Sequence, residues 1–265
     1  MLDDWHVHTN FSTDSDADPD AVIQKAIALG MRRICITDHY DMDWPGGGFE
    51  LDTESYLKKL EELQTKYAGQ IDVRIGVEMG LQPELSVGER VWNFINSYPF
   101  DFAIGSVHLV DGVDPYDRDK ISLTDDQLYS RYFDLVLENV RKPRGYQALG
   151  HLDYVVRYGY SKAENYSYEK YEDVIDSILM EIINRGIALE VNTAGIRYGL
   201  GFPNPHPDII RRYHNLGGEL ITVGSDAHRP EDVGYGMEQI RDLLLSLGIH
   251  YITEYKKKQP EMVHL

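Results

Sequence analysis

The sequence contains almost no cysteine and no apolar run long enough to cross a membrane. Its one cysteine, Cys35, excludes an internal disulfide and lies in an apolar run, where a packed thiol in a reducing compartment is expected. A bilayer-spanning helix needs about 20 consecutive apolar residues, and no run approaches that length. Asp3 and Asp4 occupy the place where a signal peptide carries basic residues. These features predict a cytoplasmic protein without a membrane partner.

Positive charge is also scarce. The 265 residues include 26 Lys and Arg against 44 Asp and Glu, which gives a formal net charge of -18. Such a surface repels nucleic-acid phosphates unless a basic patch or bound metal ions oppose the repulsion. The one basic cluster, 256–258, is expected to be a solvated tail. We therefore expect no nucleic-acid partner.

Short apolar runs alternate with amphipathic segments along the whole chain. A first helix is expected between the Asp18 cap and Gly30, and further helices are predicted near 53–67, 84–97, 124–141, 167–185, 206–215 and 234–247. A strand is expected to lead into 6–8, and others are predicted at 34–36, 73–75, 102–104, 146–149, 187–191 and 220–223. Seven βα units without a linker predict a single α/β domain over 1–265, a barrel related to the TIM barrel. The alternative is a doubly wound open sheet, but no glycine-rich phosphate turn follows the first strand.

Histidines and carboxylates directly follow these predicted strands. They are His6, His8, His39, Glu78, His108, His151, Asp226 and His228. In a TIM-type barrel the carboxyl ends of the strands meet on one face, so these side chains should converge. Residues two apart on a strand point to the same side, as His6 and His8 do. So many imidazoles and carboxylates indicate a site for several metal ions, and Glu78 can bridge two of them.

Four sequence blocks that contain these residues resemble the polymerase-and-histidinol-phosphatase (PHP) family of phosphoesterases. The blocks are HVHTNFSTD at 6–14, ITDH at 36–39 with GVE at 76–78, SVH at 106–108 with GHLD at 150–153, and GSDAH at 224–228. They span nearly the whole chain in the expected order. The resemblance implies a distorted seven-stranded (β/α)7 barrel, in agreement with the count of βα units.

The resemblance also implies three divalent metal ions. It assigns three ligand sets: His6, His8, Glu78 and Asp226; Glu78, His108 and His151; and His39, His228 and a residue of the loop after His8. Asp14 takes this last position, where some family members have histidine, and Asp16 is the alternative. Zinc, manganese and iron all suit such donors, although the extra carboxylate favours manganese or iron over zinc.

Within the family the chain looks most like the histidinol-phosphate phosphatases, through segments 100–108, 150–159 and 190–199. Arg157 and Arg197 follow strands in two of these segments. Guanidinium groups match phosphate oxygens, so both are predicted to bind the substrate phosphate. The expected partner is a small phosphomonoester, with Tyr116, Tyr158 and Tyr198 as candidates for contacts with its organic part.

The expected reaction is hydrolysis of L-histidinol phosphate to L-histidinol and phosphate in histidine biosynthesis. A hydroxide that bridges two of the ions held by Glu78 would attack phosphorus, and Asp226 or His228 would protonate the leaving oxygen. Three alternatives stay open. They are a PHP-type nuclease or phosphoesterase with another substrate, a TIM-barrel amidohydrolase, and a metal-bound protein that is not an enzyme. An amidohydrolase commonly bridges its metals with a lysine, and the third and fourth strands contain no suitable one.

Overall fold

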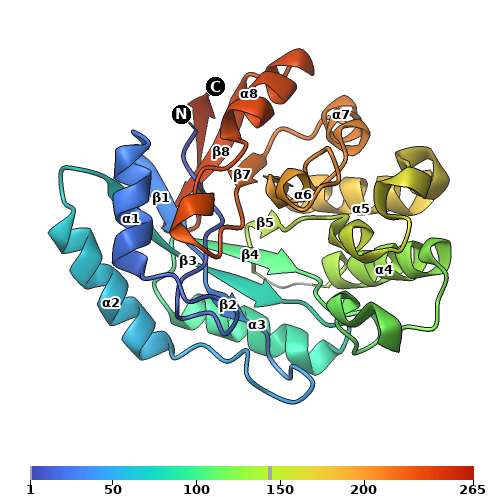
Figure 1. The fold of residues 1–265 in the computed structure, drawn as a ribbon, viewed down its shortest axis with the longest axis horizontal. Coiled ribbons are helices and arrows are strands. Elements are labelled where there is room, and N and C mark those ends of the chain that lie inside the picture. Colours follow the sequence, from blue (N-terminus) through green and yellow to red (C-terminus); the bar gives the residue numbers. More distant parts are fainter. Residues whose placement is uncertain (1, 143–144) are drawn as a thin grey trace.

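The computed structural model describes residues 2–142 and 145–265. A curled parallel sheet forms its centre, and helices lie around the outside of the curl (Figure 1). The strand order is β1 (Arg33–Ile36), β3 (Asp72–Gly80), β4 (Phe102–Ser106), β5 (Ala148–Leu149), β6 (Ala188–Asn192) and β7 (Ile221–Gly224), with β2 (His39–Tyr40) paired to β3. The strands are almost wholly buried, which explains their apolar sequences. Six predicted strands are confirmed, and the parallel curl confirms a distorted barrel rather than an open sheet.

All seven predicted helices are present. The helices are α1 (Pro19–Ala28), α2 (Thr53–Lys66), α3 (Leu85–Ser97), α4 (Asp125–Val140), α5 (Glu172–Arg185), α6 (Ala194–Arg197), α7 (Pro207–Asn215) and α8 (Met237–Ser246). Among the α-helices of the described residues, only the short α6 was not predicted. The Asp18 side chain caps α1, and Thr124 forms a capping box with Gln127 at the start of α4. None of the helices in the described ranges is long and apolar enough to cross a membrane.

The segment that contains the predicted first strand is not a regular strand. It lies between β1 and β7 and makes only isolated bridges, one to Ile34 in β1 and one to Ala227 just beyond β7. The Trp5 amide donates to the Val223 carbonyl at 3.1 Å, and the Thr37 amide donates to the Val7 carbonyl at 2.8 Å. Because its hydrogen bonds alternate between two neighbours, no continuous ladder forms. The segment nevertheless closes the curl and brings its two histidines to the carboxyl ends of the strands.

A carboxyl-terminal hairpin, β8 (Tyr251–Lys256) and β9 (Gln259–His264), was not predicted. The Ile221 amide, at the start of β7, donates to the Thr253 hydroxyl at 3.1 Å. The hairpin therefore lies at the amino ends of the strands, opposite the histidines. Its turn contains the basic cluster 256–258, which is not a solvated tail because the Lys258 amide donates to the Asp101 carbonyl at 2.7 Å.

Candidate metal centre

Glu78, near the end of β3, lies at the centre of the predicted metal ligands and is fully buried. Its Oε2 lies 3.1 Å from His6 Nε2 and 3.4 Å from His8 Nε2. Its Oε1 lies 3.2 Å from His108 Nε2 and 3.1 Å from His151 Nε2. Oε2 also lies 3.0 Å from His39 Nδ1. The two oxygens of one carboxylate thus face different imidazoles, three at Oε2 and two at Oε1, which is the arrangement expected of a bridging ligand.

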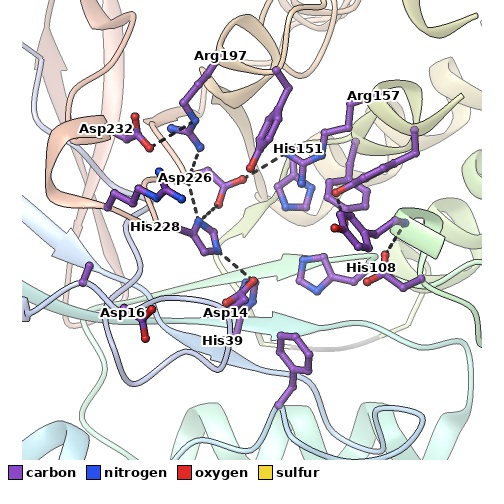
Figure 2. Close-up of a pocket in the computed structure, with 18 of the residues that line it drawn as sticks. Asp14, Asp16, His39, His108, His151, Arg157, Arg197, Asp226, His228 and Asp232 are labelled. Carbon is purple, nitrogen blue, oxygen red and sulfur yellow. Dashed lines mark hydrogen bonds and ion pairs between the residues drawn. The ribbon is translucent and has the colours of Figure 1, made fainter. Parts of the chain in front are cut away.

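The remaining predicted ligands, Asp14, His39, Asp226 and His228, line the cavity next to this cluster (Figure 2). Asp226 Oδ1 lies 3.3 Å from His8 Nε2. Asp14 Oδ2 lies 3.2 Å from His228 Nε2 and 3.7 Å from His39 Nε2. Asp16, the alternative to Asp14, also lines the cavity in front of the cluster. These distances place Asp14 beside both histidines.

Three groups of these side chains have ligand atoms within 4.8 Å of one another. The groups are His6, His8 and Glu78; His39, Glu78 and His108; and His8, His39 and His228. Each group shares a member with another, so ions bound in them would be neighbours. The Nε2 atoms of His6 and His8 and Oε2 of Glu78 are buried without a hydrogen-bond partner among the described residues. Buried polar atoms in native proteins normally have partners, and metal ions would satisfy all three atoms. The donor set therefore fits divalent metals.

The charges in the cluster favour a bound cation. Burial disfavours an ionised Glu78, but the imidazoles of His6, His39 and His108 outweigh this effect and hold its pKa well below its usual range. Burial also opposes charge on His39, yet Glu78 and Asp14 raise its pKa to about 9. The carboxylates thus impose a negative potential that protons compensate in the absence of metal. Divalent ions would meet the same potential.

Two carboxylates that sequence reasoning missed hold the far side of the ligand imidazoles. Glu190 Oε1 lies 2.5 Å from His6 Nδ1, and Asp41 Oδ1 lies 2.8 Å from His108 Nδ1. When Nδ1–H donates to a carboxylate, Nε2 keeps its lone pair free for a metal. One signal was available in the sequence, since Glu190 is the only charged residue of the apolar run 187–191.

Asp38 organises the loop between His8 and Ser12. Its carboxylate accepts hydrogen bonds from the Thr9 amide at 2.6 Å and from the Ser12 hydroxyl at 2.6 Å. The Ser12 oxygen in turn lies 3.1 Å from His8 Nδ1 and accepts from the His39 amide at 3.0 Å. One buried carboxylate therefore fixes the surroundings of two predicted ligands.

The cluster opens into a cavity of about 890 Å³, which Arg157 and Arg197 also line (Figure 2). The Arg157 guanidinium carbon lies 4.1 Å from the ring centre of Tyr154 and 4.6 Å from that of Tyr198. Its Nη1 lies 3.9 Å from Asp226 Oδ2. The aromatic rings hold the cation in place and leave it facing the cluster. Two of the tyrosines predicted for substrate contacts, Tyr158 and Tyr198, thus also support Arg157.

Arg197 reaches the cavity from the short helix α6, but part of its guanidinium is committed to the protein. Its Nη1 donates to the Ser225 carbonyl at 3.1 Å and its Nη2 to the Asp226 carbonyl at 2.8 Å. Nε lies 3.9 Å from Asp232 Oδ2. Arg197 therefore fixes the loop that presents Asp226, in addition to facing the cavity.

The chain is similar in sequence and in structure to known proteins. The sequence model of the PHP domain family matches residues 4–194. A histidinol-phosphatase from Lactococcus lactis is 31% identical over 95% of this chain and 93% of its own length. A probable histidinol-phosphatase from Thermotoga maritima is 33% identical, over 96% of each chain. The crystal structure of the L. lactis histidinol phosphate phosphatase, complexed with zinc, L-histidinol and phosphate, matches with a TM-score of 0.89 and 30% identity, over 98% of this chain and 100% of that one.

Proposed function

The chain belongs to the PHP domain family, and on that premise we propose that it is a metal-dependent phosphomonoesterase that hydrolyses L-histidinol phosphate to L-histidinol and phosphate. One observation carries the proposal: the buried ligand cluster and two arginines open into the same cavity. A phosphate in that cavity would meet metal ions on one side and guanidinium groups on the other. The similar phosphatase from L. lactis, solved with zinc, L-histidinol and phosphate, supports the choice of substrate.

The proposed metal centre contains three divalent ions in neighbouring sites. The first would be held by His6, His8, Glu78 and Asp226, the second by Glu78, His108 and His151, and the third by His39, His228 and Asp14. The contacts of Asp14 with both histidines support its choice over Asp16. Zinc, manganese and iron all suit this mixture of imidazole and carboxylate donors. The first and third sites draw ligands from both ends of the chain, which supports residues 1–265 as one catalytic domain.

Bound ions would supply Lewis acidity and activate water for attack on phosphorus. The chain's own residues bind and orient the substrate phosphate. Arg157 is held against Tyr154 and Tyr198, so it loses little conformational freedom when it binds a phosphate oxygen. Arg197 adds a second positive charge on the same wall of the cavity. Both charges would be worth more in the transition state, where charge on the equatorial oxygens increases.

The organic part of the substrate would meet a different part of the cavity. L-Histidinol carries an amine and an imidazole, both of which can be cationic. The carboxylates of Asp114, Glu231 and Asp232 and the ring of Tyr116 line the same cavity and suit such groups. Asp226 and His228 also face the cavity, so either could pass to the leaving oxygen the proton that the attacking water gives up.

A phosphate-release assay tests the proposal. The protein would be reconstituted separately with Zn²⁺, Mn²⁺ and Fe²⁺ and offered L-histidinol phosphate, a nucleoside monophosphate and single-stranded DNA. Phosphate release is measured for the two monoesters, and cleavage of the DNA is followed by the shortening of the strand, because hydrolysis of a phosphodiester releases no inorganic phosphate. We expect rapid release from L-histidinol phosphate, little from the nucleoside monophosphate and little shortening of the DNA. Equal or faster cleavage of the DNA would support the nuclease alternative. Loss of activity when a metal chelator is added would distinguish both the phosphatase and the nuclease from an enzyme that needs no metal.

A further inference from the structure

Glu190 lies on β6 inside the barrel and is 1% exposed. Each of its oxygens contacts a different predicted metal ligand. Oε1 lies 2.5 Å from His6 Nδ1, whereas Oε2 accepts a hydrogen bond from the His151 backbone amide at 2.7 Å. The Asn192 side-chain amide also donates to Oε2, at 3.2 Å. Both oxygens of this buried carboxylate are therefore used.

We propose that Glu190 is a positioning residue that couples two of the metal sites by fixing a ligand of each. The inference rests on the metal centre of the proposed function. His6 is assigned to the first site and His151 to the second, and Glu78 bridges the two from the other side. Glu190 thus forms a second link between the same two sites, without being placed as a ligand itself.

For His6, the contact determines which ring nitrogen can bind metal. A carboxylate accepts hydrogen bonds, so Nδ1 of His6 must carry the proton that the 2.5 Å contact requires. Nε2 then keeps its lone pair and points at Glu78 Oε2, 3.1 Å away. The contact also fixes the rotation of the imidazole ring, and the negative charge makes the ring a stronger electron donor.

For His151, the contact replaces a missing hydrogen bond of the sheet. Strand β5 is only two residues long, and its last pair with β6 is Leu149 with Leu189. Beyond that pair the chain leaves the sheet, and the amide of His151 would be a buried donor without a partner. Glu190 Oε2 supplies the acceptor, which holds the backbone of His151 at the end of the strand.

The neighbouring strand leaves room for this arrangement at Gly224. A Cβ atom added at Gly224 would lie 2.2 Å from the Cβ of His6 and 3.1 Å from Glu190 Oε1. Any larger residue there would push His6 and Glu190 apart. The glycine of the GSDAH block is therefore explained by close approach of these two side chains.

The test is metal binding by Glu190→Gln, with Glu254→Gln as the matched control. Glu254 is another buried glutamate, but it pairs with Arg33 at the opposite end of the barrel. Co²⁺ titration, with a competing chelator, gives the affinity and number of bound ions, and the visible absorption of Co²⁺ reports ligand geometry. In Glu190→Gln we expect two ions to bind about 10- to 100-fold more weakly, with an altered spectrum. Glu254→Gln should bind Co²⁺ like the parent protein.

Circular dichroism and thermal unfolding of the metal-free variants separate positioning from stability. A similar loss of stability in both variants, with metal binding weakened only in Glu190→Gln, supports the proposal. Parent-like Co²⁺ affinity in Glu190→Gln, or weaker binding of one ion alone, overturns it. If Glu190→Gln does not fold, Glu190→Asp provides the test. It keeps the charge but is one methylene too short to make both contacts. It should therefore still weaken the binding of two Co²⁺ ions, and parent-like affinity would overturn the proposal.

These readouts need no substrate. If the parent protein binds metal but does not hydrolyse L-histidinol phosphate, the proposed substrate fails and the result for Glu190 stands. If the parent binds no metal, the metal centre and the role of Glu190 fail together.

Discussion

Replacing Arg157 with alanine should lower kcat/KM without removing metal. The side chain contacts phosphate in the proposed complex but is not placed as a metal ligand. A hydrogen bond to a charged group contributes about 1.5–3 kcal/mol. At about 1.36 kcal/mol for each factor of ten, kcat/KM should fall roughly 10- to 150-fold. Because the guanidinium is only 10% exposed and stacked on tyrosine rings, we expect the upper half of that range.

Lysine at the same position should restore only part of the activity. It keeps the positive charge but loses the planar stack on Tyr154 and the forked pair of donors. Arg197→Ala should behave differently from Arg157→Ala, because Arg197 also holds the carbonyls of Ser225 and Asp226. We expect it to weaken metal binding as well as phosphate hydrolysis.

The assay is steady-state phosphate release from L-histidinol phosphate, with bound metal measured on the same samples. Arg131→Ala is the control, because Arg131 pairs with exposed Asp111 on the surface and should leave both quantities unchanged. If Arg157→Ala retains the parent kcat/KM with its metals bound, Arg157 does not bind the phosphate. If the activity of Arg157→Ala falls only in proportion to the metal that it loses, Arg157 supports the metal centre and does not bind the phosphate.

Four other substitutions test the metal centre and the surrounding fold. Glu78→Gln should lose more than one ion per chain by elemental analysis, since the two oxygens of Glu78 face different imidazoles; full metal content would argue against a bridge. Asp14→Ala should lose one ion by the same measurement and Asp16→Ala none, and the reverse result would assign the third site to Asp16. Burial raises the pKa of Asp125, but hydrogen bonds from Ser161 outweigh it and lower the value from 3.8 to about 2, so this carboxylate stabilises the fold above pH 3.8. Asp125→Asn should therefore lower the urea midpoint of unfolding at neutral pH. The difference between the midpoints of parent and variant should shrink as the pH falls from 3.8 toward about 2. A difference that stays constant would exclude the ionised carboxylate as the cause of the lost stability.

Much of the candidate site could be predicted because most of the proposed ligands directly follow strands. Glu78 and His108 directly follow short apolar runs, and the parallel barrel places all such ends on one face. The contacts of Glu190 and Asp41 could not be predicted in this way. They depend on how strands and loops far apart in the sequence align, and the local periodicity of the sequence does not predict that alignment.

The departures of the fold from the sequence-based expectation have similar causes. The segment that leads into 6–8 was expected to be an ordinary strand, but its hydrogen bonds alternate between two neighbours and form no continuous ladder. The carboxyl-terminal hairpin was missed because its turn has no glycine. Lys257 and Lys258 adopt positive φ angles of 49° and 63° there, which non-glycine residues rarely do. The docking of Arg197 on the Ser225 carbonyl depends on α6, a helix too short for its periodicity to be read.

The segment that closes the barrel has a consequence for how the protein is made. Asp4 accepts hydrogen bonds from Ser225, which is 221 residues later in the chain. His6 Nε2 likewise lies 3.8 Å from Asp226 Oδ1, a residue that is made only near the end of the chain. On a ribosome, the amino-terminal histidines emerge early but cannot complete their site until nearly the whole chain has followed. Contacts of such long sequence separation form late in folding. Tight metal binding should therefore mark the last step of maturation, and chains stalled before β7 should not retain their ions.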